Sequence, residues 1–295
     1  MRLDLLRAKR VVRRCGVLAA VALAGWLAAT PVPAADEAAP AAVPAAVEQA
    51  PEEPPLIEPA AREAVKRMVQ ALGDAQAMSF EYETSYDSLQ DDGELLEFGT
   101  HGEITIRRPD RLRGEVWYRD GRHLVYAYDG AKFALYGAGQ NVYASTPRTG
   151  DLDSLVDFLR DDIGLKMPVA DLFLSDLKQL LIENVVAARY IGKEKIDGDE
   201  VEHVSLRLRV GVDVQLWIRT KDGLPGRIAL NYATAEGRPS FRADIDDWDL
   251  KPNAKDSRFV LAMPKGAREI PFASRPKRAD VEVEPQDAAP PEGTR

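Results

Sequence analysis

Residues 204–218 read VSLRLRVGVDVQLWI, and every second side chain on each side of Gly211 is apolar. Side chains on a β-strand point alternately to the two faces of a sheet, so this pattern predicts strands with one buried and one exposed face. Gly211 interrupts the alternation and predicts a bend or turn between two strands. This arrangement is typical of an antiparallel sheet that covers a core with one face and meets water with the other.

The same alternation recurs on both sides of this stretch. It predicts further strands within residues 80–86, 104–106, 112–118, 124–128, 228–232, 241–245 and 259–263. Pairs such as Asp120-Gly121, Asp129-Gly130 and Asp222-Gly223 separate the runs, as expected for antiparallel hairpins. Residues 137–142 begin like a dinucleotide-binding loop, but they lack its third glycine and a following helix, so we interpret them as another hairpin turn.

Helical spacing of apolar residues appears at three places in the chain. It predicts a helix over residues 61–72 and two mid-chain helices over 152–159 and 172–185. A sheet of about ten strands must curl, close or split to bury its apolar face. We therefore predict a mainly β (α+β) fold, with a large curved antiparallel sheet that forms a half-open barrel under a helical lid. Two packed sheets are the alternative, but they would leave the mid-chain helices less surface to cover.

The N-terminal 34 residues have the pattern of a secretory signal peptide. Six Lys and Arg residues precede an apolar run from Val17 to Ala29, and small residues follow around Ala34. The run is shorter than the ~20 residues that a membrane-spanning helix needs, although an uncleaved anchor is the alternative. Cys15 precedes the run, whereas a lipidated cysteine would follow it, which argues against a lipoprotein. We expect cleavage after Ala34 or Ala35 and a periplasmic location.

Composition divides the rest of the chain into a linker, one domain and a tail. Residues 35–56 are rich in Ala, Pro and Glu, and residues 274–295 are similar, so both are predicted to be disordered around a domain at 57–273. The whole chain carries a net charge of −9, and the signal segment contributes +5, so the mature protein carries −14. Such an acidic protein is a poor candidate for binding nucleic acid or anionic membranes. Without Cys15 it also lacks disulfides, so it depends on its core for stability.

The order of these segments resembles a known family. The resemblance rests on the succession of signal peptide, helix and two meanders, on Pro168-Val169-Ala170-Asp171-Leu172-Phe173 between the meanders, and on the ending FVLAMPKGAREI at 259–270. These features resemble the periplasmic family known as domain of unknown function 2092, which is similar to the LolA/LolB lipoprotein carriers. The resemblance covers residues 57–273 and implies a half-open barrel with a helical lid over a hydrophobic cavity.

A search of the sequence for catalytic or metal-binding patterns finds none. There is no G-x-S-x-G motif, and the mature chain has no cysteine nucleophile. The three histidines are far apart in the sequence and lack zinc spacing, so we expect surface positions for His101, His123 and His203. The acidic cluster of Asp244, Asp246, Asp247 and Asp249 is interpreted as a solvated strand end rather than a calcium site. Strand geometry points Asp247 away from Asp246 unless a bulge intervenes. We expect no metal and no cofactor.

Tyrosines on the predicted buried face suggest an apolar cavity with polar groups in its wall, because a buried phenol usually needs a partner. We predict a non-catalytic protein that binds a lipid or acyl chain, with a membrane protein or lipoprotein as partner and a role in transport. The alternative is an interaction module with a solid core and Trp117 or Trp217 on its partner surface. The predicted cavity residues are Tyr82, Val116, Tyr118, Tyr126, Tyr128, Phe173, Leu177, Leu181, Leu206, Leu216 and Tyr232.

Overall fold

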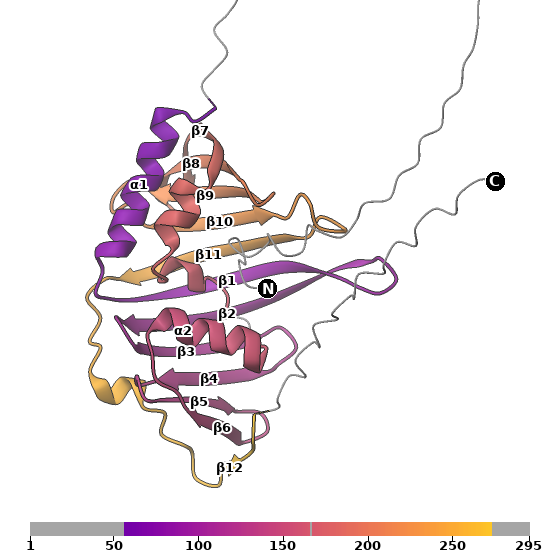
Figure 1. Ribbon diagram of the computed structural model, residues 1–295, viewed down its shortest axis with the longest axis vertical. Coiled ribbons are helices and arrows are strands. Elements are labelled where there is room, and N and C mark those ends of the chain that lie inside the picture. Colours follow the sequence, from indigo (N-terminus) through magenta and orange to yellow (C-terminus); the bar gives the residue numbers. More distant parts are fainter. Residues whose placement is uncertain (1–55, 166, 273–295) are drawn as a thin grey trace, which may run out of the picture.

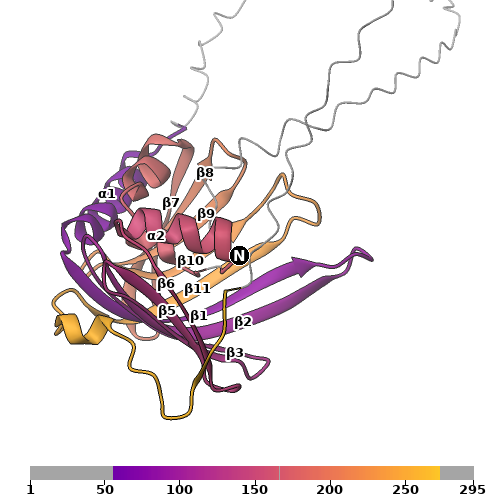
Figure 2. The same ribbon diagram turned by 60° about the horizontal axis from the view of Figure 1, so that its bottom comes forward.

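The computed structural model describes residues 56–165 and 167–272. The predicted signal peptide, the linker up to residue 55 and the predicted tail lie outside the described residues. Within the described part of the chain, the strands form one sheet of twelve in the order β12-β6-β5-β4-β3-β2-β1-β11-β10-β9-β8-β7 (Figure 1). Figure 2 shows that this sheet is strongly curved.

Two meanders make up the sheet. The first contains β1 (Ala77–Leu89), β2 (Leu95–Arg107), β3 (Arg111–Tyr118), β4 (His123–Tyr128), β5 (Lys132–Gly137) and β6 (Val142–Pro147). The second contains β7 (Val185–Ile196), β8 (Asp199–Leu208), β9 (Asp213–Arg219), β10 (Pro225–Asn231) and β11 (Ser240–Asp249). Antiparallel pairing of β1 with β11 joins the meanders, and the short β12 (Arg268–Glu269) pairs in parallel with β6. The predicted mainly β fold with one large curved antiparallel sheet is confirmed.

The helices lie on the concave face of the sheet (Figure 2). Helix α1 (Pro59–Asp74) begins at a proline, which suits the first helical turn, and buries the stripe predicted from its spacing, including Ala64, Met68 and Leu72. Helix α2 (Leu152–Phe158) continues into a π-helical turn over Leu159–Ile163. Buried residues of both helices belong to the same core cluster as the apolar strand face.

The predicted helix over residues 172–185 is wrong in its extent, because the chain is helical only over residues 177–183 of this range and at Leu172, the last residue of a preceding 3₁₀ turn. The chain instead forms a 3₁₀ turn at Ala170–Leu172 and a π-helical turn at Gln179–Glu183, and β7 starts at Val185. Residues 170–174 are all buried. A surface helix with one apolar stripe exposes some of any five consecutive residues, so this run needs an irregular backbone to bury every side chain. Below, residues 152–183 are called the helical segment.

The predicted strand at 259–263 is also wrong. Asp256–Phe259 is a 3₁₀ turn, and residues 260–267 form no strand. Phe259 is buried, the Arg107 guanidinium lies 5.5 Å from its ring centroid, and Arg107 pairs with Asp256. Leu261 and Met263 are half-buried, so burial alternates along this segment although it joins no strand, and Pro264 soon afterwards lacks the amide that a ladder needs.

Strands β5, β6 and β7 were missed in the sequence. In β7 the register shifts between Val185 and Ala187 and again between Tyr190 and Gly192. Each extra residue moves the following side chains to the opposite face, so the strand has no sustained alternation. The turn at residues 138–141 does connect β5 to β6, as the hairpin interpretation requires.

Two glycines allow large rings to lie flat on the concave face. A Cβ atom at Gly102 in β2 would lie 2.7 Å from the Tyr82 hydroxyl, and one at Gly114 in β3 would overlap the Tyr126 ring. Tyr82 comes from β1 and Tyr126 from β4, so each ring crosses the neighbouring strand where a side chain is missing. The missing side chains are therefore needed for the packing of both tyrosines.

We predict that Gly114→Ala destabilises the protein by about 1–3 kcal/mol, because the added methyl group displaces a ring that is fully packed. The control is Gly139→Ala, since a Cβ atom at Gly139 has no atom within 4 Å and its φ is not positive. The control should change the free energy of unfolding by less than about 0.5 kcal/mol. Chemical denaturation of both variants measures the effect, and equal stabilities would contradict the prediction.

Candidate ligand site on the concave face

The eleven predicted cavity residues lie together on the concave side of the sheet. Nine of them belong to the buried core cluster, and the half-buried Tyr118 and Tyr232 pack against it. The strands supply one wall, and Phe173, Leu177 and Leu181 from the helical segment supply the other. Their role as ligand contacts stays a prediction.

Tyr82 and Tyr126 each place an aromatic ring across the neighbouring strand on this face. Tyr82 from β1 reaches across Gly102 in β2, and Tyr126 from β4 reaches across Gly114 in β3. The Tyr82 side chain is 2% exposed, and its buried hydroxyl has no hydrogen-bond partner among the described residues. A buried hydroxyl without a partner costs free energy, so this position calls for a functional explanation.

Burial makes these phenols harder to ionise than an exposed tyrosine. Desolvation raises the pKa of Tyr82 well above its usual value, and the nearby Tyr126 and Tyr118 raise it further. Desolvation also raises the pKa of Tyr126, with a smaller contribution from Tyr118. Both hydroxyls therefore keep their protons at neutral pH and act as hydrogen-bond donors.

The other predicted tyrosines have different surroundings. The Tyr128 hydroxyl donates a hydrogen bond to the Gly150 carbonyl at 2.7 Å, so it fixes the chain just before α2. Tyr118 lies at the end of β3 with the Arg122 guanidinium 4.1 Å from its ring centroid. Tyr232 follows β10, beyond the strand in which the sequence placed it. Tyr128 is fully buried, so Tyr82 and Tyr126 differ from it not in depth but in the lack of a backbone acceptor for their hydroxyls among the described residues.

A small apolar pocket lies at the α1 end of the concave face. It has a volume of about 80 Å³ and is lined by Ile57, Arg62, Val65, Leu181, Ile182, Val185, Ala188 and Leu206. Two of the predicted cavity residues, Leu181 and Leu206, thus contact free space. On the same measure about 10–15 Å³ holds one water molecule, so this pocket has room for several groups of that size.

Arg108, which the sequence did not single out, connects the sheet to the helices. Its guanidinium donates hydrogen bonds to the carbonyl oxygens of Phe173 at 2.6 Å, Ala75 at 3.1 Å and Leu72 at 3.5 Å. Burial lowers the pKa of Arg108 from its usual value, and Asp153 partly offsets this effect. One side chain thereby holds the C-terminal end of α1 and the helical segment against the β2–β3 turn. No motif marks such a residue, because its partners are backbone carbonyls.

The histidines lie on the outer face, as expected for surface strands. Folding brings two of them together, because His101 in β2 and His123 in β4 stack on opposite sides of Trp117 in β3, with centroid distances of 5.0 and 4.8 Å. His203 in β8 stacks on Trp217 in β9 at 4.2 Å. The two tryptophans that the sequence placed on the outer face are therefore half-covered by imidazole rings.

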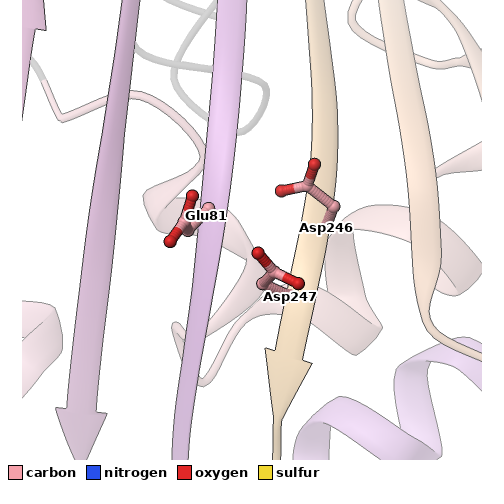
Figure 3. Close-up of side chains that lie close together, drawn as sticks. All are labelled: Glu81, Asp246 and Asp247. Atoms are coloured by element: carbon pink, nitrogen blue, oxygen red, sulfur yellow. The ribbon is translucent and has the colours of Figure 1, made fainter.

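The acidic cluster is drawn together by a β-bulge. The pairing of β1 with β11 shifts between Ser79 and Glu81, and Asp247 adopts a positive φ of 46°. The bulge turns Asp247 toward Asp246, and one carboxylate oxygen from each of Glu81, Asp246 and Asp247 lies within 4.8 Å of the others (Figure 3). All three residues are exposed, beside an open groove of about 460 Å³ that Glu83, His101 and Trp117 also line.

The fold and this interior define a class: an open, curved antiparallel sheet with helices and buried tyrosines on its concave face. The sequence profile described as "Predicted periplasmic protein (DUF2092)" matches residues 61–273. The chain belongs to this family, and the resemblance found in the sequence is confirmed. No curated protein matches the sequence. None of the described helices has the length and apolar character that crossing a membrane requires.

Several solved structures share similarity with this chain. The lipoprotein LppX of Mycobacterium tuberculosis is 14% identical, with a TM-score of 0.43, over 67% of this chain and 100% of LppX. LprF from Mycobacterium bovis is 12% identical, with a TM-score of 0.42, over 72% of this chain and 99% of LprF. A chain of the MucA/MucB complex of Pseudomonas aeruginosa is 16% identical, with a TM-score of 0.38, over 68% of this chain and 61% of the matched chain.

We predict that Asp247→Asn stabilises the protein by about 0.2–1 kcal/mol at neutral pH and low salt, because it removes a like charge beside Asp246. Asparagine also tolerates the positive φ at this position. Burial, and after it the charge of Asp247, raises the pKa of Asp246. The Asp246 carboxylate therefore takes up a proton at a higher pH in the folded state than in the unfolded state. As the pH falls through the folded-state pKa of Asp246, protonation of this carboxylate makes the wild type more stable. The stabilisation by Asp247→Asn therefore becomes smaller at low pH.

Urea denaturation at pH 7 and pH 4, in low and high salt, tests this prediction. Asp91→Asn in the exposed β1–β2 turn is the matched control and should have little effect. A stabilisation that is unchanged in 1 M salt would contradict the electrostatic cause.

Proposed function

We propose that this protein is exported to the periplasm, where it binds and carries a hydrophobic or amphiphilic ligand, such as a lipid or a lipoprotein acyl chain. The observation that carries the proposal is a curved sheet whose concave face is apolar and holds neutral, buried tyrosines beneath a helical segment. The family description agrees with a periplasmic location.

Burial of the ligand's chain supplies the affinity in this proposal. Each methylene transferred from water to the apolar interior contributes about 0.8 kcal/mol. The pocket beside Leu181 and Leu206 takes the chain end, and the remaining methylenes enter as the helical segment moves away from the sheet. Arg108 sets the cost of this movement, because its hydrogen bond to Phe173 is broken when the segment leaves.

The proposed role is binding without catalysis. A catalytic tyrosine acts as a base or nucleophile after losing its proton, which requires a lowered pKa. Burial instead raises the pKa of both Tyr82 and Tyr126. These hydroxyls are suited to hold a polar group in place rather than to react with it.

An interaction module with a solid core is the second candidate function. The β1–β2 hairpin projects beyond its neighbours (Figure 1) and exposes Leu95, Leu96 and Phe98, which are 40%, 38% and 44% exposed. Exposed apolar residues that lie together often mark a partner surface. In that case the concave face serves only as core, and the protein retains no ligand.

The carrier proposal predicts that the protein purified from the periplasm contains, or takes up by titration, one amphiphile per chain. Native mass spectrometry and lipid extraction measure this directly. Leu177 is buried, and Leu177→Lys should reduce retention at least tenfold, because it places a charge on the face that covers the ligand. A ligand-free wild-type protein that takes up no amphiphile would favour the interaction module.

The matched control for this variant is Gln179→Lys, since Gln179 is exposed in the same helical segment. It should retain the ligand like the wild type. Thermal unfolding of both variants is measured in parallel, because a buried lysine also destabilises the fold. Retention that is unchanged in a folded Leu177→Lys protein would contradict the proposed ligand position.

The export proposal predicts that the mature protein begins at Ala35 or Asp36, because the basic, apolar and small-residue regions occur in the order that signal peptidase recognises. N-terminal sequencing of periplasmic protein measures the cleavage site. Recovery of intact Met1 from the membrane fraction would contradict cleavage and support an uncleaved anchor.

A further inference from the structure

The hydroxyls of Tyr82 and Tyr126 occupy diagonally neighbouring positions on the concave face. Gly102, which lies beneath the Tyr82 hydroxyl, pairs with Val116, and Gly114, which lies beneath the Tyr126 ring, pairs with Ile104. Gly102 and Gly114 are thus two residues out of register on adjacent strands. Such diagonal neighbours are about 7–8 Å apart, so one carbonyl oxygen accepts directly from one hydroxyl and reaches the other through a water molecule.

Both hydroxyls are available as donors to such a group. The Tyr82 hydroxyl is buried and has no partner among the described residues. No hydrogen bond between described residues uses the Tyr126 hydroxyl either, whereas Tyr128 on the same strand donates to Gly150. Two neutral phenols without an acceptor of their own match a ligand that brings the acceptor.

The surroundings of this pair are uncharged. The pKa of Tyr82 is shifted by burial and by two other tyrosines, and the pKa of Tyr126 by burial and by Tyr118, with no contribution from a charged side chain. The nearest buried polar pair is also neutral, with the hydroxyl oxygens of Thr84 and Thr100 2.7 Å apart. A carboxylate placed here would lose its hydration without gaining a cation, which is unfavourable.

We propose that Tyr82 and Tyr126 form a paired donor site that binds the neutral carbonyl oxygen of an ester or amide in the ligand. This inference rests on the proposed function and specifies the polar part of the ligand that the concave face takes. The apolar chain of the ligand packs against the surrounding aliphatic side chains. The ester or amide carbonyl satisfies the hydroxyl that is otherwise left without a partner.

Two probes of equal chain length test the proposal in the mature protein. They are the methyl ester of hexadecanoic acid and hexadecane, each competing with a fluorescent apolar dye. The wild type should bind the ester more tightly. Tyr82→Phe and Tyr126→Phe should each weaken ester binding by about 2- to 10-fold, the usual effect of one hydrogen bond, and leave hexadecane binding unchanged.

A control and a ligand-free measurement separate this role from a structural one. Tyr136→Phe removes a hydroxyl on β5 that binds the Asn141 side chain at 3.0 Å, and it should change neither affinity. Without ligand, Tyr82→Phe should be at least as stable as the wild type, because the removed hydroxyl has no partner to lose. A merely structural tyrosine would instead lower the melting temperature when it is changed.

The outcomes distinguish this inference from the function on which it rests. If the wild type binds neither probe, the proposed function fails, and this inference fails with it. If the wild type binds both probes and the Phe variants bind the ester unchanged, or lose both probes equally, only the paired donor site is overturned. Hexadecanoate that binds more than tenfold tighter than its methyl ester would overturn the preference for a neutral acceptor.

Discussion

The antiparallel pairing of β1 with β11 is the constraint on which the rest of the molecule depends. It joins two meanders that are otherwise separate, and so creates one continuous apolar face from β6 to β7. The junction places Glu83 opposite Asp244, an unfavourable pair of like charges, but Arg227 pairs with Asp244 from the neighbouring β10. On the inner side, Phe80 packs against Trp248 with a centroid distance of 4.5 Å. Apolar packing on one face thus accompanies charge compensation on the other.

The concave face of a single curved sheet must be covered by segments outside the strands. Here the helical segment between the two meanders covers part of it. The helical segment does this with short and irregular turns, which bury consecutive residues such as Leu172 and Phe173 but form few regular backbone hydrogen bonds. Elements of this kind open at a lower free energy than long helices or central strands. Arg108 stabilises the position of these turns by donating hydrogen bonds to three backbone carbonyls, two at the end of α1 and one in the helical segment. The cover is thus held by these hydrogen bonds as well as by its buried apolar side chains.

The sequence predicts the parts of this fold that follow a single period. Alternation located the strands of the central sheet, and the stripe of α1 was read directly from residues 61–72, because each depends on one buried face. The prediction failed where the period is broken, by bulges in β7 and by the buried run at 170–174, and where burial alternates without a strand, after Phe259. The residues of the candidate site also fall into predictable and unpredictable groups. The buried tyrosines follow from alternation, whereas Arg108 and the position of Asp247 depend on tertiary contacts and on a bulge that no local pattern encodes.

On the concave face, two strand-interior glycines lie beneath buried tyrosines. Glycine in a strand interior weakens the strand, and tyrosine in a dry interior leaves a hydroxyl to be satisfied, so the combination is unfavourable for a plain core. At Gly102 a larger residue is excluded in any case, because its Cβ atom would also overlap the backbone carbonyl oxygen of Glu115. On the outer face, by contrast, histidines, tryptophans and carboxylates find partners across neighbouring strands. Under the proposed function, the ligand supplies the acceptor that the buried Tyr82 hydroxyl lacks among the described residues.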